Sequence, residues 1–195
     1  MSRPLRLIIF DVDGTLVDSQ ASILRAMRAA FGQFDLPEPA QVEILSIVGL
    51  SLDHAIARLC PDQPEHMQDN LVQAYKDAFH RHRVQNGSTG SPLYPGARDM
   101  LEQLAAVPEN LLGVATGKSQ RGLDALLAEH RLEQMFVTRQ VADHHPSKPH
   151  PSMIETAMAE AGVDQSNTVM IGDTSFDMDM AKAAGVAGIG VSWGY

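Results

Sequence analysis

The stretch Leu7-Ile8-Ile9-Phe10-Asp11-Val12-Asp13-Gly14-Thr15 determines how the rest of the chain can be interpreted. Its first four residues are apolar without interruption, which is typical of a strand buried on both faces of a parallel sheet. The run stops at two carboxylates two positions apart, and in extended backbone these leave the strand on the same side. The sequence therefore predicts a buried strand with two acidic side chains at its carboxyl end.

Similar apolar runs alternate with helical patterns further along the chain. Strands are expected at 111–115, 168–171 and 186–191, with a further short one at 135–137. Apolar residues at helical spacing predict helices over 97–106, 122–129 and 151–161. Strands that alternate with helices favour an α/β fold, here a doubly wound, Rossmann-like parallel sheet.

The stretch 18–91 interrupts this alternation. Its apolar residues recur only at helical spacing, and Met27, Phe31 and Met67 are expected to pack in a core of their own. We therefore predict an inserted all-α cap over 18–91 and an α/β core made of 1–17 and 92–195. The Gly- and Ser-rich segment 86–92 is interpreted as a flexible exit linker.

Composition restricts the class of partner. The 195 residues carry a formal charge of −9, which argues against nucleic acid as a partner. The sequence offers neither a signal-like leader nor an apolar run near the roughly 20 residues that span a bilayer. A single cysteine, Cys60, suits a reducing compartment. We expect a cytoplasmic protein with no membrane partner, either a monomer or a homodimer.

Polar groups follow the three clearest strands. Asp11 and Asp13 follow the first, Thr116-Gly117-Lys118 follows the second, and Asp173 and Asp177 follow the third. Ligands of open α/β sheets bind beyond the carboxyl ends of the strands, so these groups could converge. Clustered carboxylates repel one another unless a cation lies between them, and hard oxygen ligands suit Mg²⁺.

Each of these residues also has a structural interpretation. Thr116 could cap the next helix, and Asp177 is expected partly to cap its own. Lys118 is interpreted as a solvated or supporting lysine. Lys148 stands among prolines, where a lysine is normally a surface residue. The basic run 80–83 is expected to end the last cap helix and to stabilise its C-terminus rather than bind substrate.

A zinc site is the alternative metal centre. His144, His145 and His150 lie close together in sequence, but no cysteine is near them and prolines shape the loop. Zinc is therefore not expected there.

Four motifs in chain order resemble those of the haloacid dehalogenase superfamily. They occupy 10–19, 115–118, 147–151 and 172–178, and Tyr94-Pro95-Gly96 resembles the return from a cap into the core. Within the superfamily the chain is similar to phosphoglycolate phosphatase-like members. The resemblance implies a Mg²⁺-dependent phosphatase that acts on small phosphate monoesters, possible substrates including phosphoglycolate, through an aspartyl-phosphate intermediate.

The resemblance also implies catalytic roles. Asp11 would attack phosphorus, and Asp13 would protonate the leaving oxygen and then activate water. Thr116 and Lys148 would hold the phosphoryl oxygens. A weak nucleophile that divides one displacement into two steps is a known use of aspartate, and a second carboxyl group then supplies acid–base help.

Binding roles follow in the same way. The metal would be held by Asp11, by Asp13 through its backbone carbonyl, and by Asp173, with Asp177 as a nearby carboxylate. Gly117 would lie beside the substrate next to Thr116 and Lys148. The cap segment 47–51, which contains Gly49, could face the site from between two cap helices.

The same residues argue for or against the other activities of the superfamily. A dehalogenase would not need Asp13. A phosphonate-cleaving enzyme would need a cap lysine, and Lys76, the only lysine in the insert, shows no sign of burial on its helix face. A phosphomutase stays open, as does a non-catalytic phospho-ligand-binding protein, although the latter would be expected to have lost Asp11, Asp13 or Asp173.

The C-terminal residues depart from the pattern. Superfamily members usually continue past 191–195 with a further helix and often a short strand. The resemblance therefore implies either a shortened sequence or a less covered sheet edge.

Overall fold

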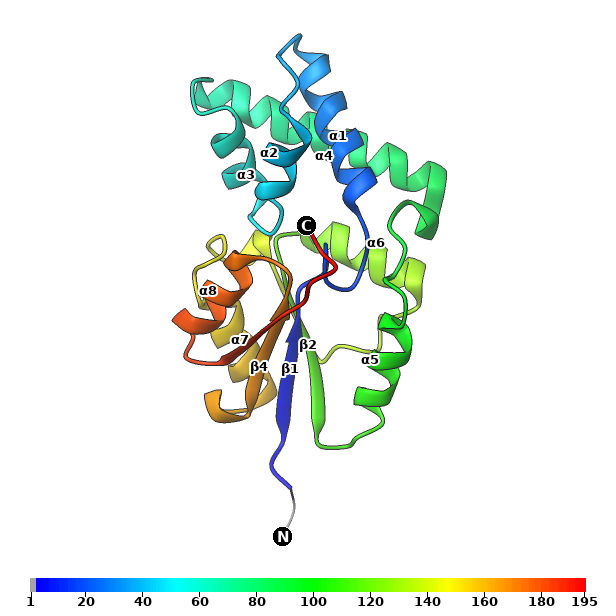
Figure 1. The fold of residues 1–195 in the computed structure, drawn as a ribbon, viewed down its shortest axis with the longest axis vertical. Coiled ribbons are helices and arrows are strands. Elements are labelled where there is room, and N and C mark those ends of the chain that lie inside the picture. The colour runs from blue at the N-terminus through cyan, green and yellow to red at the C-terminus, as the bar shows by residue number, and fades with distance from the viewer. Residues whose placement is uncertain (1–2) are drawn as a thin grey trace.

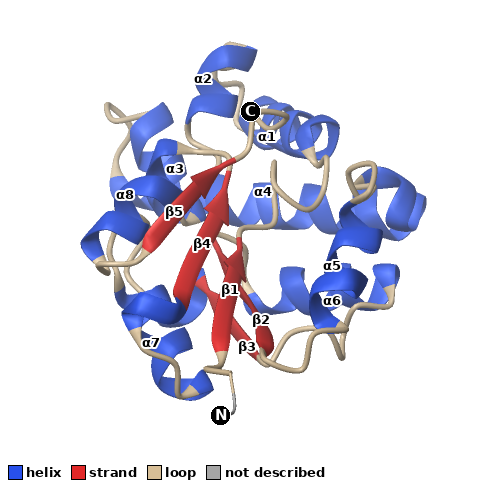
Figure 2. Cartoon of the chain, turned by 60° about the horizontal axis from the view of Figure 1, so that its bottom comes forward, coloured by secondary structure: helices blue, strands red, loops and turns tan. Residues whose placement is uncertain are grey.

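The computed structural model describes residues 3–195 and builds them around one sheet of five parallel strands in the order β3-β2-β1-β4-β5. Figure 2 shows the strands side by side, with β1 in the middle. The strands are β1 (Arg6–Phe10), β2 (Asn110–Thr116), β3 (Thr138–Val141), β4 (Thr168–Gly172) and β5 (Ala187–Gly190). The predicted doubly wound α/β core is confirmed.

Both faces of the sheet are covered by helices, which explains the unbroken apolar run in β1. Leu7 and Ile9 point to one face and pack with α7 (Ser152–Ala161) and α8 (Ser175–Ala183). Phe10 points to the other face and packs with α5 (Ala97–Ala105) and α6 (Gln120–His130). Each such buried side chain contributes about 1.5–3 kcal/mol.

The chain between β1 and α5 is helical, and its helices lie beyond the carboxyl ends of the strands (Figure 1). They are α1 (Gln20–Gln33), α2 (Gln41–Ser46), α3 (Leu52–Leu59) and α4 (Glu65–Asn86). Met27 and Phe31 are buried in a separate apolar cluster with Ile44, Ile56 and Leu71. We call residues 18–91 the cap from here on.

Two expectations about the cap were wrong. Helix α2 was not predicted, because six residues with a single buried side chain, Ile44, give too weak a pattern. Met67 is only partly buried and lies outside the apolar cluster of the cap. A 3₁₀ turn (Gly87–Gly90) occupies the predicted exit linker.

The strand predicted at 135–137 was also wrong, because the strand begins at Thr138. Phe136 is buried although it lies outside any strand, so the apolar run marks burial rather than strand pairing. In β3 itself, Thr138 and Gln140 are buried polar residues that both donate to Glu160, at 2.6 Å and 2.8 Å. These polar residues hid the strand from a hydrophobicity pattern.

Among residues 3–195, no helix is both long enough and apolar enough to cross a bilayer.

Candidate active site

Asp11, Lys148 and Asp177 form a buried charged cluster beyond the carboxyl ends of β1 and β4. The Lys148 Nζ lies 2.7 Å from Asp11 Oδ1 and 2.6 Å from Asp177 Oδ1. All three side chains are at most 1% exposed. A lysine among prolines would normally lie at the surface, but two carboxylates compensate its charge here and make its burial possible.

The electrostatics of this cluster are unbalanced. Burial lowers the pKa of Lys148, but Asp11 and Asp177 raise it by more, so its pKa lies above the ordinary value. Burial raises the pKa of Asp11 to about 8, against the lowering effect of Lys148, and the carboxylates of Asp177 and Asp173 add to the rise. One ammonium group therefore faces three carboxyl groups, and the site favours a further cation.

The donor set fits Mg²⁺. Carboxylate oxygens of Asp11, Asp173 and Asp177 lie within 4.8 Å of one another. Asp11 Oδ2 is buried and has no hydrogen-bond partner in the part of the chain that the structure describes. A buried oxygen without a donor is costly, and a hard cation would satisfy it.

Asp177 has less capacity left for a metal than the other two carboxylates. Its Oδ1 accepts from Lys148, while its Oδ2 accepts from Thr174 N at 3.1 Å and from Thr174 Oγ1 at 2.7 Å. Thr174 in turn is the N-cap of α8, so Asp177 does cap its own helix as predicted. Asp173 is held by Thr15 Oγ1 at 3.0 Å and by Tyr195 N at 3.1 Å.

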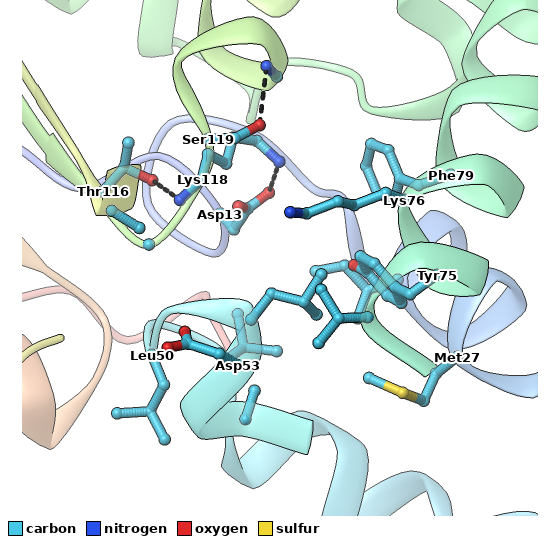
Figure 3. Close-up of a pocket in the computed structure, with 18 of the residues that line it drawn as sticks. Asp13, Met27, Leu50, Asp53, Tyr75, Lys76, Phe79, Thr116, Lys118 and Ser119 are labelled. Atoms are coloured by element: carbon cyan, nitrogen blue, oxygen red, sulfur yellow. Dashed lines mark hydrogen bonds and ion pairs between the residues drawn. The ribbon is translucent and has the colours of Figure 1, made fainter. Parts of the chain in front are cut away.

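The Asp13 carboxylate pairs with residues outside this cluster. Its Oδ1 lies 2.8 Å from Lys118 Nζ (Figure 3). The same oxygen also accepts from the Ser19 hydroxyl. The Lys118 side chain is only 11% exposed, and its Nζ lies 5.0 Å from the centre of the Phe79 ring. Of the two interpretations of Lys118, a solvated or a supporting lysine, the structure agrees with the second, because the side chain is directed inward at Asp13.

Ser19 and Tyr195 are site residues that the sequence analysis missed. The Tyr195 hydroxyl accepts from Ser19 N at 2.8 Å and lies 2.9 Å from Ser19 Oγ. Burial and the nearby Asp13 raise the pKa of Tyr195 above its ordinary value, so the hydroxyl stays protonated. Ser19 stands within the quoted first motif, which was a usable signal, whereas no sequence pattern pointed to Tyr195.

Thr116 ends β2 and faces the same site. Its side chain is 1% exposed, and its Oγ1 accepts from Lys118 N at 3.2 Å. The N-cap of α6 is Ser119, whose Oγ accepts from Gly122 N at 3.2 Å. The helix-cap interpretation of Thr116 was therefore wrong. Its hydroxyl donates to no partner among the described residues, so it can donate to a ligand.

Gly117 and Gly49 bring the core and the cap into contact. A Cβ atom on Gly117 would lie 2.4 Å from the Leu50 carbonyl oxygen and 2.8 Å from that of Gly49. The segment 47–51 connects α2 to α3 and reaches the loop that follows β2, as the sequence analysis expected.

The change Gly117→Ala should therefore displace the cap segment. A backbone carbonyl cannot rotate away as a side chain can, and a misplacement of about 1 Å can cost about 100-fold in rate. We expect kcat/KM of the reaction at this site to fall about 10- to 100-fold while the Tm shifts by only a few degrees. Gly32→Ala in α1 is the matched control, since a Cβ there meets no atom within 4 Å. Wild-type kcat/KM in Gly117→Ala would contradict the need for this close contact.

A cavity of about 570 Å³ lies between the core and the cap. Asp11, Asp13 and Thr116 line it from the core, and Gly49 lines it from the cap. Lys76 is exposed, as predicted, but it also lines the cavity, and Figure 3 shows its amino group directed toward Asp13. No pattern in the sequence had placed Lys76 near the site.

The basic run 80–83 does not end α4, which continues to Asn86. Arg83 is nonetheless in the last turn of α4, as predicted, whereas His80 is not. Both residues also line the cavity, where the prediction had not placed them. His145, one of the three histidines considered as zinc ligands, contacts other side chains through both ring nitrogens. His145 Nδ1 contacts Ser152 and its Nε2 contacts Gln140, each at 2.8 Å, within the described residues.

The sequence is similar to a family of hydrolases and to known phosphatases. Residues 8–191 match the family of haloacid dehalogenase-like hydrolases. The chain is 37% identical over 192 residues to "Probable phosphatase IndB" of Dickeya dadantii, covering 96% of this chain and 81% of that protein. It is 29% identical over 195 residues to a phosphoglycolate phosphatase of Pasteurella multocida, covering 97% and 87%.

A solved structure shares the fold. The crystal structure of a "predicted phosphoglycolate phosphatase" from Haemophilus somnus superposes with a TM-score of 0.85 at 24% identity and covers 100% of this chain and 88% of that one. The family match spans both the carboxylate cluster and the cap. The chain belongs to the haloacid dehalogenase-like hydrolases and is a phosphatase-type member of that family, similar to phosphoglycolate phosphatases.

Proposed function

We propose that the chain hydrolyses small phosphorylated metabolites, phosphate monoesters such as phosphoglycolate, in a Mg²⁺-dependent reaction with an aspartyl-phosphate intermediate on Asp11. The observation that carries the proposal is the buried Asp11 carboxylate. One of its oxygens is paired with Lys148, the other has no hydrogen-bond partner in the described residues, and the residue lines the cavity. The carboxylate therefore has one oxygen for a cation and a second, held by Lys148, that can attack an electrophile.

Asp11 and Asp13 divide the reaction into two steps. In the first, an Asp11 oxygen bonds to phosphorus, the ester P–O bond breaks, and the Asp13 proton passes to the leaving oxygen. In the second, Asp13 takes a proton from water, which attacks the phosphorus and releases phosphate and the Asp11 carboxylate. Ser19 and Lys118 hold Asp13 in orientation for both steps.

Lys148 and Thr116 bind the phosphoryl oxygens. An ammonium group has three donors, and Lys148 gives two of them to Asp11 and Asp177, which leaves one for the substrate. The Thr116 hydroxyl and Gly117 lie at the end of β2, beside the expected position of the phosphoryl group. These donors act where negative charge develops, in a site that the cap shields from water.

Mg²⁺ would be held by Asp11, by the Asp13 backbone carbonyl and by Asp173, with Asp177 beside it. It would supply positive charge against the phosphoryl oxygens. The unbalanced charge of the carboxylate cluster and the unpartnered Asp11 oxygen support this assignment.

We further propose that residues 1–17 with 92–195 form the catalytic unit, and that the cap, 18–91, closes over it. Such closure commits the substrate and excludes bulk water. A phosphomutase would use the same Asp11 and Asp13, and a phospho-ligand-binding protein would use the same pocket. Release of inorganic phosphate into solution separates hydrolysis from both alternatives.

The proposal is tested by phosphate release from p-nitrophenyl phosphate and from phosphoglycolate, before and after exhaustive chelation. We expect activity that falls to background on chelation and returns with Mg²⁺, because the carboxylates repel one another and the substrate without it. Circular dichroism checks that the chelated protein remains folded. Full activity after chelation would exclude the metal, and no release from any ester would exclude the phosphatase.

A further inference from the structure

A second group of basic side chains lines the same cavity, on the wall made by α4 and α6. His80 and Arg83 come from α4, and Arg121 comes from α6. The His80 Nδ1 lies 3.1 Å from Arg83 Nη2, and the His80 Nε2 lies 3.3 Å from Arg121 Nη2. The imidazole thus lies between two guanidinium groups, one from the cap and one from the core.

This arrangement has more donors than acceptors. A guanidinium group only donates, and a neutral imidazole has one donor and one acceptor nitrogen. Whichever ring nitrogen carries the proton, His80 can accept from only one of the two arginines. The other contact then joins two donors, so at least one N–H group lacks an acceptor within this cluster.

The local charge is also unbalanced. Arg83 Nη1 lies 3.5 Å from Glu129 Oε1, which offsets one of the two guanidinium charges. Within the described residues, no carboxylate lies within 4.0 Å of the Arg121 guanidinium. Arg121 is exposed, so water meets its donors in the free protein. A ligand with anionic oxygens would replace that water and also supply the missing charge.

Acidic residues that line the cavity do not fill this role. Asp143 accepts from Gln120 N at 2.8 Å at the start of α6, and Asp53 lies 3.3 Å from His54. Asp77 follows Lys76 on α4. None of the three forms an ion pair with Arg83 or Arg121 among residues 3–195.

The position of the cluster determines what kind of ligand could reach it. Lys76 is directed at the Asp13 end of the cavity (Figure 3), and Arg83 follows seven residues later on the same helix. Seven residues of α-helix span about 10 Å. The backbone of Arg83 is therefore about 10 Å from that of Lys76, so a group bound by Arg83 and Arg121 would be distinct from the phosphoryl group at Asp11. The cavity of about 570 Å³ has room for a ligand that carries both groups.

We infer that His80, Arg83 and Arg121 form a distal anion site, which selects phosphate esters whose leaving group ends in a second anionic group. That group is a carboxylate or a second phosphate, separated from the ester by a spacer longer than the single carbon of phosphoglycolate. This inference rests on the proposed phosphatase activity and specifies its substrate class. Because Arg121 belongs to the core and Arg83 to the cap, such an anion would also hold the two together.

Matched substrate pairs test the distal anion site. We compare 6-phosphogluconate with sorbitol 6-phosphate for a carboxylate, and fructose 1,6-bisphosphate with fructose 6-phosphate for a phosphate. We expect kcat/KM to be about 10- to 100-fold higher for the anionic member of at least one pair, the gain typical of a charged hydrogen bond. The pair that shows the preference identifies the anion.

Arg121→Gln should remove that preference, mainly by raising KM for the anionic substrate and much less for its neutral partner. Arg81→Gln is the matched control, since Arg81 is exposed on α4 and does not line the cavity. Equal kcat/KM within both pairs, or a ratio unchanged by Arg121→Gln, would overturn the distal site. Hydrolysis of the neutral esters in that case would leave the phosphatase proposal intact. The absence of any hydrolysis would reject the phosphatase proposal. If titration calorimetry then showed that Arg121→Gln does not weaken binding of 6-phosphogluconate or fructose 1,6-bisphosphate, the distal anion site would be rejected as well.

Discussion

Asp11→Asn should reduce turnover of every phosphate ester to near background, a loss of about 10⁴-fold or more. The amide keeps the shape of the carboxylate, and its oxygen can still accept from Lys148, but it cannot serve as the nucleophile. The covalent route then closes for activated and unactivated esters alike. Steady-state phosphate release and intact-protein mass measure the two consequences: turnover is lost and no phosphorylated protein forms.

The control for Asp11→Asn is Asp179→Asn. Asp179 is exposed on α8, two residues from the buried Asp177, and the change removes the same charge from the protein. We expect it to retain wild-type turnover. Substantial turnover by a folded Asp11→Asn protein would show that another residue or a water molecule attacks the phosphorus, and the covalent mechanism would have to be abandoned.

Asp13→Asn should impair the reaction in a different way, with a loss of rate of about 10²–10⁴-fold that depends on the leaving group of the ester. The change removes the acid and the base but leaves Asp11, Lys148 and Asp173 in place. An activated ester such as p-nitrophenyl phosphate needs little protonation, so its first step should be affected less than that of an alkyl phosphate. Single-turnover kinetics with both esters separate that first step from hydrolysis of the intermediate.

The slow second step in Asp13→Asn should let phosphorylated protein accumulate, visible as a mass increase of about 80 Da. Peptide mapping should place the adduct on Asp11, and Asp11→Asn combined with Asp13→Asn should show none. An adduct on a different residue, or equal losses in the first step for both esters, would contradict the separate roles given to the two carboxylates.

Much of the core could be predicted from sequence because its signals are local. An apolar run of four residues followed by Asp11 specifies a buried strand, and the helices that flank the sheet repeat their apolar residues at helical spacing. Where the pattern mixed polar and apolar residues the prediction failed. The strand Thr138–Val141 buries Thr138 and Gln140 because Glu160 accepts from both, and no local pattern reveals such a distant partner.

By itself, the sequence determined the fold class, the presence of a helical insert and the residues that end the strands at the site. These follow from backbone periodicity and from the rule that parallel strands present their carboxyl ends at one edge. Only the tertiary structure decided which charges meet. It paired Lys148 with both Asp11 and Asp177, turned Lys118 inward to Asp13, and placed His80 between Arg83 and Arg121. Apart from His80 and Arg83, which are neighbours on α4, these contacts join residues 29 to 137 positions apart, and burial sets their strength, so spacing along the chain could not reveal them.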